Sequence, residues 1–242
     1  MISVPGLTAA LVILALTGCA SIRGMKPGVT EAEAQKSMLI GWWYASFRIN
    51  WPPDEEPALY TDLLIAHRVL SPVLDRYRKD ILLWRFHRRA ARDEAGHRFS
   101  FIFYSTAATA RKIYSAIDSS AVLAQLQAQG MILRVLMDDT NTLSRSGLEA
   151  TSDRSWSEPL QKAWPYFIMG VSQTWLDLIS QYAGDRGGQP LSTVEMLAFY
   201  REIGQEVETT WQKEGGHAFL HHLNALFGYG PVNLRDKTEM RF

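Results

Sequence analysis

The alternation of residues between His97 and Ser105 constrains the fold of this chain more than any other feature. Phe99, Phe101 and Phe103 are separated by single residues, Ser100 and Ile102. Successive side chains of a β-strand point to opposite faces, so the three phenylalanines would share one face. A helix would scatter them around its axis. The segment therefore predicts a strand whose aromatic face lies in a core. The residues that point the other way are Arg98, Ser100, Ile102 and Tyr104.

Three further segments have the composition of strands. Apolar and polar residues alternate from Trp43 to Asn50 and again from Ile81 to Arg89, and Met131 to Asp138 is a short apolar segment. Period-two alternation with aromatic and branched residues is typical of strands. The apolar face expected for the second segment carries Leu82, Trp84 and Phe86. The sequence thus predicts four strands.

The first strand has a competing interpretation. Thr30 to Glu33 has the form of a capping box, which predicts a helix that runs to about Ile40. A continuation of this helix through Trp51 is the alternative to a strand.

Helical spacing of apolar residues fills the two longer gaps between the strands. Leu59 to Tyr77 is one such segment, and Pro72 is expected to kink or split it. Thr106 to Gln129 is the other, with a break at Asp118–Ser120 and an end at Gly130. The order strand, helix, strand, strand, helix, strand is that of the ferredoxin-like split β-α-β arrangement. We therefore expect an α+β sheet domain over residues 30–139.

The hairpin between the second and third strands has a predicted register. A turn at Asp93–Gly96 pairs Phe86 with Phe103 and Arg85 with Tyr104. A slip by one residue would exchange the two faces, so burial of the phenylalanines should fix which face is which.

Residues 140–242 predict a C-terminal helical subdomain. A polar loop precedes a helix that begins near Ser157, with Pro159 in its first turn. Ser192 to Glu195 is a second capping box, which starts a helix to about Lys213. Gly215–Gly216 is expected to separate this helix from a last short one.

The N-terminal residues resemble a known targeting signal. Leu7 to Leu16 is apolar but too short to cross a bilayer, which takes about 20 residues. Leu16-Thr17-Gly18-Cys19 follows, and Cys19 is the only cysteine. This segment resembles the lipobox signal of bacterial lipoproteins, although no Lys or Arg precedes Leu7. The resemblance implies removal of residues 1–18 and acylation of Cys19 with fatty chains such as palmitate.

The same resemblance implies a location. Residues 19–29 contain Gly24 and Pro27 and lack periodicity, as expected for a tether between the lipid on Cys19 and the domain. In lipoproteins of Gram-negative bacteria, a residue other than Asp after the cysteine is typical of the outer membrane, and here it is Ala20. For such a host we expect a periplasm-facing, lipid-anchored protein of the outer membrane.

The charge balance limits the expected partners. The chain has 25 Lys and Arg against 25 Asp and Glu, so no net field attracts nucleic acid. No phosphate-binding loop, dinucleotide fingerprint or nucleophile elbow occurs, and we expect no cofactor. With Cys19 acylated, no cysteine remains for a disulfide or for catalysis.

One face of the predicted sheet carries the main candidate site. Every predicted strand places an arginine on its polar face, and the guanidinium fork suits carboxylate and phosphate groups. The candidate ligand-binding residues are Arg85, His87, Arg89, Arg98, Tyr104 and Arg134. Their expected neighbours are Tyr44, Arg48 and Ser100. The alternative is structural: the face lies in water, or its arginines pair with carboxylates of packing helices.

Two smaller groups have weaker patterns. His217 and His221 are four residues apart and could share a metal ion, but two ligands do not make a site. Asp138 and Asp139 end a predicted strand, where they could bind a cation, serve as a general base or simply form a turn.

These observations favour a membrane-tethered binding or assembly module for an anionic ligand or a protein partner. The alternative is a periplasmic enzyme that uses the Arg/His face of the sheet or the Asp138/Asp139 pair. A separate aromatic stripe from Trp164 to Tyr182 could line an apolar ligand pocket, but such stripes are more often core or interface.

Overall fold

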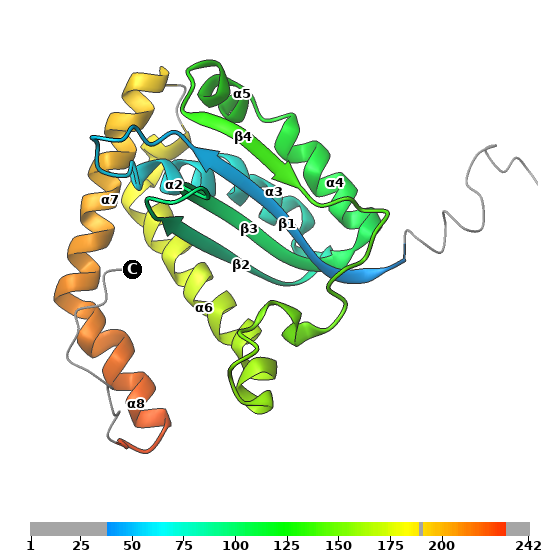
Figure 1. The fold of residues 1–242 in the computed structure, drawn as a ribbon. Helices are drawn as coiled ribbons and strands as arrows, with labels where there is room; N and C mark the ends of the chain where they lie inside the picture. Colours follow the sequence, from blue (N-terminus) through cyan, green and yellow to red (C-terminus); the bar gives the residue numbers. More distant parts are fainter. Residues whose placement is uncertain (1–37, 189–190, 231–242) are drawn as a thin grey trace, which may run out of the picture.

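A computed structural model describes residues 38–188 and 191–230. Its centre is a four-stranded antiparallel sheet in the order β2-β3-β1-β4 (Figure 1). The strands are β1 (Ile40–Ile49), β2 (Ile81–Ala90), β3 (His97–Thr106) and β4 (Ile132–Met137). This order is that of the split β-α-β arrangement, so the α+β prediction is confirmed. The alternative of a helix through Trp51 is wrong. The expected helix at Thr30 and the segment around Cys19 lie outside the described residues.

The connection from β1 to β2 is helical with a wide turn in its middle. It comprises α2 (Tyr60–Leu64), the π-helix η1 (Ile65–Leu70), α3 (Ser71–Tyr77) and the 3-10 turn η2 (Arg78–Asp80). Pro72 has no N–H, and its ring would collide with a carbonyl of a regular preceding turn. The π-helix ends at Leu70, two residues before Pro72, as expected for a helix that must accommodate this ring.

The connection from β3 to β4 is split in two as predicted. It consists of α4 (Ala107–Asp118) and α5 (Ala121–Ala128). Ser120 ends the break: its Oγ accepts a hydrogen bond from the N–H of Leu123 at 3.3 Å and so caps α5.

The C-terminal region consists of α6 (Glu158–Ala183), α7 (Thr193–Gly215), the π-helix η5 (Gly216–His221) and α8 (His222–Leu226), with 3-10 turns η3 (Leu148–Thr151) and η4 (Gly184–Gly188). The capping box of Ser192 and Glu195 is present. The predicted separation at Gly215–Gly216 is wrong, because both glycines have helical backbone angles. The ring of Trp211 packs over Gly215, where a Cβ would lie 2.7 Å from it.

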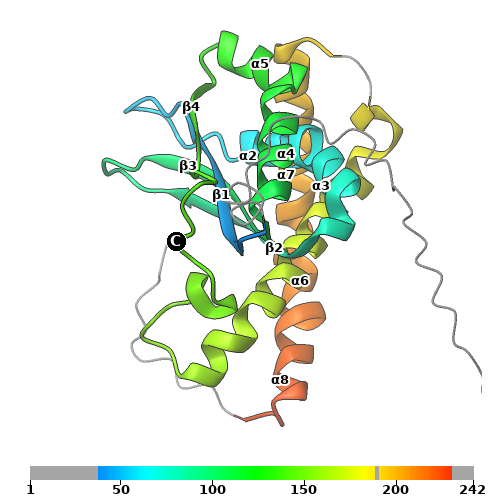
Figure 2. The ribbon, with the colours of Figure 1, turned by 90° about the vertical axis from the view of Figure 1, so that its right-hand side faces the viewer.

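One face of the sheet is covered by helices, which Figure 2 shows on the same side of the strands. Phe99, Phe101 and Phe103 are completely buried on this face. Helices α6 and α7 supply Ile179 and Tyr200 to the same core. Helix α6 also lies along the outer strand, where Ser172 Oγ accepts a hydrogen bond from the N–H of Phe86 at 3.0 Å. The edge of β2 is therefore partly satisfied by a helix rather than by another strand.

The observed hairpin register differs from the predicted one by two residues. Phe86 pairs with Phe101, and Arg85 pairs with Ile102. The last pair is Ala90 with His97, so the connection takes six residues rather than four. A shift of two leaves the side chains from Leu83 to Ala90 on their predicted faces, which is why this part of the core is as expected.

The predicted position of Leu82 on the core face is also wrong. The pairing of β2 with β3 is irregular between Ile81 and Leu83, and the inserted residue is 64% exposed. Such a bulge changes which face the preceding residues occupy. Ile81 therefore lies in the core in place of Leu82.

Candidate functional site

Four arginines form a straight row across the face of the sheet opposite the core. Arg89 pairs with Arg98, Arg98 with Arg48, and Arg48 with Arg134. Each strand contributes one residue, and neighbouring strands lie about 4.8 Å apart. We call these four residues the arginine row. Like charges directly opposite on adjacent strands repel, so this arrangement requires compensation by an anion or by solvent.

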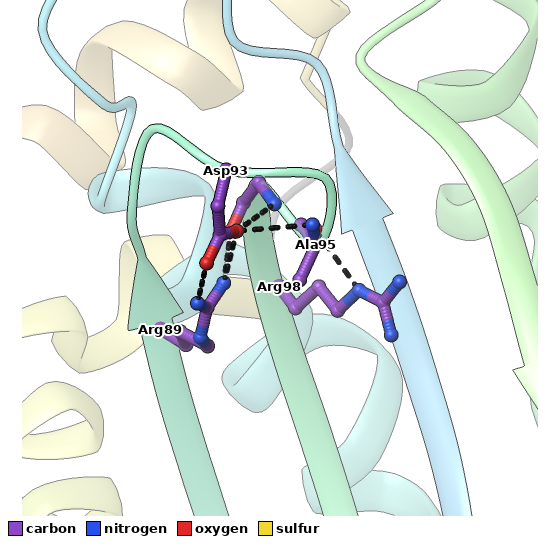
Figure 3. A network of polar contacts seen from close by, with 5 residues as sticks. Arg89, Asp93, Ala95 and Arg98 are labelled. Atoms are coloured by element: carbon purple, nitrogen blue, oxygen red, sulfur yellow. Dashed lines mark hydrogen bonds and ion pairs between the residues drawn. The ribbon is translucent and has the colours of Figure 1, made fainter.

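The positive charge of Arg89, the first member of the row, is compensated by a carboxylate of the hairpin. Arg89 Nη1 donates to Asp93 Oδ1 at 2.9 Å, and its Nη2 forms an ion pair with Asp93 Oδ2 (Figure 3). The same carboxylate accepts hydrogen bonds from the N–H groups of Ala95 and Gly96 at 3.0 and 3.1 Å. The hydrogen bond from Arg89 is the main reason that the pKa of Asp93 is well below its ordinary value.

The next two members converge on one hollow. Arg98 Nε donates to the carbonyl of Ala95 at 3.0 Å, and its guanidinium extends toward β1 (Figure 3). Arg48 Nη2 lies 3.6 Å from the position of a Cβ on Gly96. Both arginines line an open hollow of about 360 Å³ with Asp93, Glu94 and Ala95.

The row contains three arginines without a carboxylate partner. Within residues 38–188 and 191–230, no ion pair joins Arg48, Arg98 or Arg134 to Asp or Glu. Arg134 is exposed on the outer strand β4. The structural alternative expected carboxylates from packing helices, but the one carboxylate paired with the row in the described residues, Asp93, belongs to the hairpin and pairs with Arg89.

A band of small polar groups lies beside the row. His87, Ser100 and Ser46 are paired across β2, β3 and β1, and Ser100 Oγ donates to Ser46 Oγ at 3.0 Å. Partial desolvation lowers the pKa of His87 from 6.5, although its side chain is exposed, and the charges of Arg85 and Arg89 lower it further. The ring is therefore mainly neutral at pH 7.

Arg85 and Tyr104, two predicted site residues, have a structural role at the other end of this face. Arg85 Nη2 donates to the carbonyl of Thr151 at 3.2 Å, and Tyr104 OH donates to the carbonyl of Ser146 at 2.7 Å. Both hold the loop before α6 against the sheet. Burial is the main reason that the pKa of Arg85 is lowered. An apolar cluster fills the space beneath this loop: Trp42, Leu83 and Ile102.

A second hollow, of about 340 Å³, opens at the end of the sheet and shares Arg48 and Asp93 with the first. The guanidinium of Arg92 lies 3.5 Å from the ring centre of Trp51 in its wall. His97 also lines it and is nearly fully buried.

Sequence reasoning missed the buried polar group behind this hollow. Asp62 is fully buried and bonds to His97 Nε2 at 2.9 Å and to Arg88 Nε at 2.8 Å. The sequence did contain a sign of this group, because Arg88 falls on the apolar face of its predicted strand. A cation at such a position requires a nearby buried carboxylate.

The acidic pair at the end of β4 is occupied by structural contacts. Asp138 Oδ2 accepts from the N–H of Tyr44 at 2.9 Å and forms an ion pair with Arg145. Asp139 Oδ1 accepts from the N–H of Asn141 at 2.9 Å, which closes a turn. The pair is therefore engaged as the turn interpretation expects.

The histidines of the last helical segment are exposed. The rings of His217 and His221 are 5.2 Å apart and nearly parallel. The part of the chain that the structure describes contains no group of three or more His, Cys, Asp or Glu able to hold a metal ion. Beside them, Leu226 and Phe227 are each 84% exposed.

Comparison of the chain with protein-family models, with curated proteins and with solved structures found no match. Among the described helices, none has the length and apolar character needed to cross a membrane.

Proposed function

We propose that this chain is a lipid-anchored protein whose sheet binds an anionic ligand at the arginine row. The observation that carries the proposal is the set of three arginines, Arg98, Arg48 and Arg134, aligned on adjacent strands without a carboxylate partner in the described structure. Three aligned guanidiniums favour a phosphate or carboxylate ligand, because each can form charge-assisted hydrogen bonds with such groups.

The anchoring part of the proposal rests on the sequence. Cys19 would be acylated after removal of residues 1–18, and the domain would face the periplasm from the outer membrane of a Gram-negative host. Two or more acyl chains hold a protein stably at a bilayer, whereas one does so only marginally. Metabolic labelling with a palmitate analogue tests this. Label should appear on the wild-type chain and be absent from Cys19→Ser, and an equally labelled variant would refute lipidation at this residue.

Titration with orthophosphate, followed by calorimetry on the full-length chain in nonionic detergent, tests the anion site. Arg48→Gln should weaken binding about tenfold or more, since a charge-assisted hydrogen bond contributes about 1.5–3 kcal/mol. Lys112→Gln is the matched control: it removes one positive charge from α4, on the opposite side of the sheet. Equal losses of orthophosphate affinity in the two variants would mean that only the net charge of the chain matters.

A protein partner is the second candidate. The observation that favours it is the exposed apolar end of the chain's last helices, where Leu220, Leu226, Phe227 and Tyr229 are 58–84% exposed. Exposed apolar patches of this kind mark interaction sites. If a partner binds there, Phe227→Glu should abolish a cross-linked complex that Val194→Glu, at another exposed apolar position, retains. Within the described residues, no comparable observation favours the catalytic alternative.

A further inference from the structure

We infer that the arginine row binds a linear oligoanion, a chain of phosphate groups that lies across the strands, rather than a single anion. This inference rests on the proposed function and specifies its ligand. The first reason is charge. Arg98, Arg48 and Arg134 leave three positive charges in line without carboxylate partners in the described part of the chain. One small anion neutralises only part of this row, and the rest of the repulsion between adjacent strands remains.

The second reason is geometry. Arg98 and Arg134 belong to the two strands that flank β1, so their backbones are about 10 Å apart. Arg98 and Arg48 both reach the hollow beside the hairpin, where one phosphate group can be held by two guanidiniums. Arg134 lies across β1 from this hollow. A ligand that contacts all three must therefore carry anionic groups at both ends.

The third reason gives the ligand a direction. Asp93 and Glu94 line the hollow at its hairpin side. Asp93 is already bonded to Arg89, and Glu94 is an exposed negative charge that repels an anion. The free end of the ligand is consequently directed away from the hairpin, over β1 and toward β4. Ser46, in the band beside the row, accepts a hydrogen bond from Ser100 and keeps its own hydroxyl proton for the ligand.

Oligophosphates of increasing length test this inference. We propose calorimetric titration of the full-length chain, in nonionic detergent at constant ionic strength, with orthophosphate, pyrophosphate and tripolyphosphate. The dissociation constant should fall about tenfold with each added phosphate group, as one further charge-assisted contact forms. Arg134→Gln should weaken tripolyphosphate binding about tenfold and leave orthophosphate binding unchanged, because only the longer ligand reaches β4. Lys112→Gln should change neither.

The outcomes separate this inference from the proposed function. Equal affinity for orthophosphate and tripolyphosphate, or an equal loss of both in Arg134→Gln, would overturn the oligoanion and leave a single-anion site. Binding of neither would overturn both proposals. Sedimentation with phosphatidylglycerol vesicles, against phosphatidylcholine vesicles, distinguishes the source of the phosphates. The lipid on Cys19 would attach the chain to either kind of vesicle, so the measured quantity is the excess bound to phosphatidylglycerol. An excess that tripolyphosphate competes away and Arg134→Gln weakens identifies an array of lipid headgroups, whereas equal binding to both vesicles identifies a free oligophosphate.

Discussion

The two faces of the sheet are built from the same strands with the same alternation, but they differ in what covers them. On the core face, Phe101 and Phe103 stack at 4.9 Å under helices and are fully buried. On the other face, the loop before α6 covers one end and leaves the arginine row at the other end open. The comparison teaches that alternation predicts which residues share a face. Whether the polar face becomes a site depends on segments far away in the sequence.

The faces also differ in how each satisfies its charges. The core face contains one buried charge network, in which the carboxylate of Asp62 has a partner for each oxygen. The open face contains four arginines in a row, and within the described residues only Arg89 has a carboxylate partner. Buried charges must be paired because desolvation is costly, whereas charges in contact with water tolerate incomplete pairing. Incomplete pairing on the open face is what allows a ligand to complete it.

The largest expected effect concerns the aromatic ladder of the core face. Phe101→Ala should lower the free energy of unfolding by about 3–5 kcal/mol, because it removes a fully buried ring and leaves a cavity. Leu82→Ala, at the exposed bulge of β2, should change it by less than about 0.5 kcal/mol. Urea unfolding measures both. Similar losses would show that Leu82 is packed and that the bulge is misplaced.

The next largest effect concerns the buried carboxylate. Asp62→Ala should lower the free energy of unfolding by roughly 3 kcal/mol, because His97 and Arg88 lose their common partner. His97→Gln should cost less, since an amide can still donate to the carboxylate. A loss in Asp62→Ala no greater than in His97→Gln would contradict the central role given to the carboxylate.

Much of the fold was predictable because its signals are local. The period-two pattern around Phe101, the break at Ser120 and the capping box at Ser192 depend on residues close in sequence, and the structure confirms all three. The register of the hairpin was wrong because Asp93 organises a longer turn through its side chain, which spacing alone does not reveal. The bulge at Leu82 was missed because an inserted residue has no signature in the alternation of β2.

The site was predictable only in part for the same reason. The shared face of the arginines followed from strand period, and Arg89, Arg98 and Arg134 do lie in one row. The sequence could not show that Arg85 and Tyr104 have a structural role instead. Their carbonyl partners come from the loop before α6, more than 40 residues away. The ion pair between Asp62 and Arg88 needed the packing of α2 on the sheet to be known.

A smaller effect tests the repulsion within the arginine row. Arg48→Gln should raise the free energy of unfolding by roughly 0.2–1 kcal/mol, because it removes the charge between Arg98 and Arg134. The gain should shrink as salt screens exposed charges. Arg89→Gln should act in the opposite direction, since it leaves Asp93 without its ion pair. Destabilisation by Arg48→Gln at low salt would show that this arginine is structural.

The smallest expected effect concerns His87, whose pKa partial desolvation and the neighbouring arginines lower from 6.5. The unfolded chain therefore binds a proton at this residue more readily than the folded chain does. The contribution of His87 to the free energy of unfolding is fully present above about pH 6.5 and is lost as the pH falls below that value. His87→Gln should flatten this decline between pH 7 and 5.5 in urea unfolding. His67, whose pKa burial also lowers, contributes in the same direction and remains in that variant.

The same histidine reports on the open face of the sheet. A bound oligophosphate adds negative charge beside His87, which favours the protonated ring and should raise its pKa. His67 contacts Tyr200 on the helical side of the sheet, so its pKa should not respond. Titration of both rings by NMR, with and without tripolyphosphate, measures the difference directly. A rise at both histidines would indicate a general effect of the added salt, and a rise at His87 alone locates the ligand on the face that carries the arginine row.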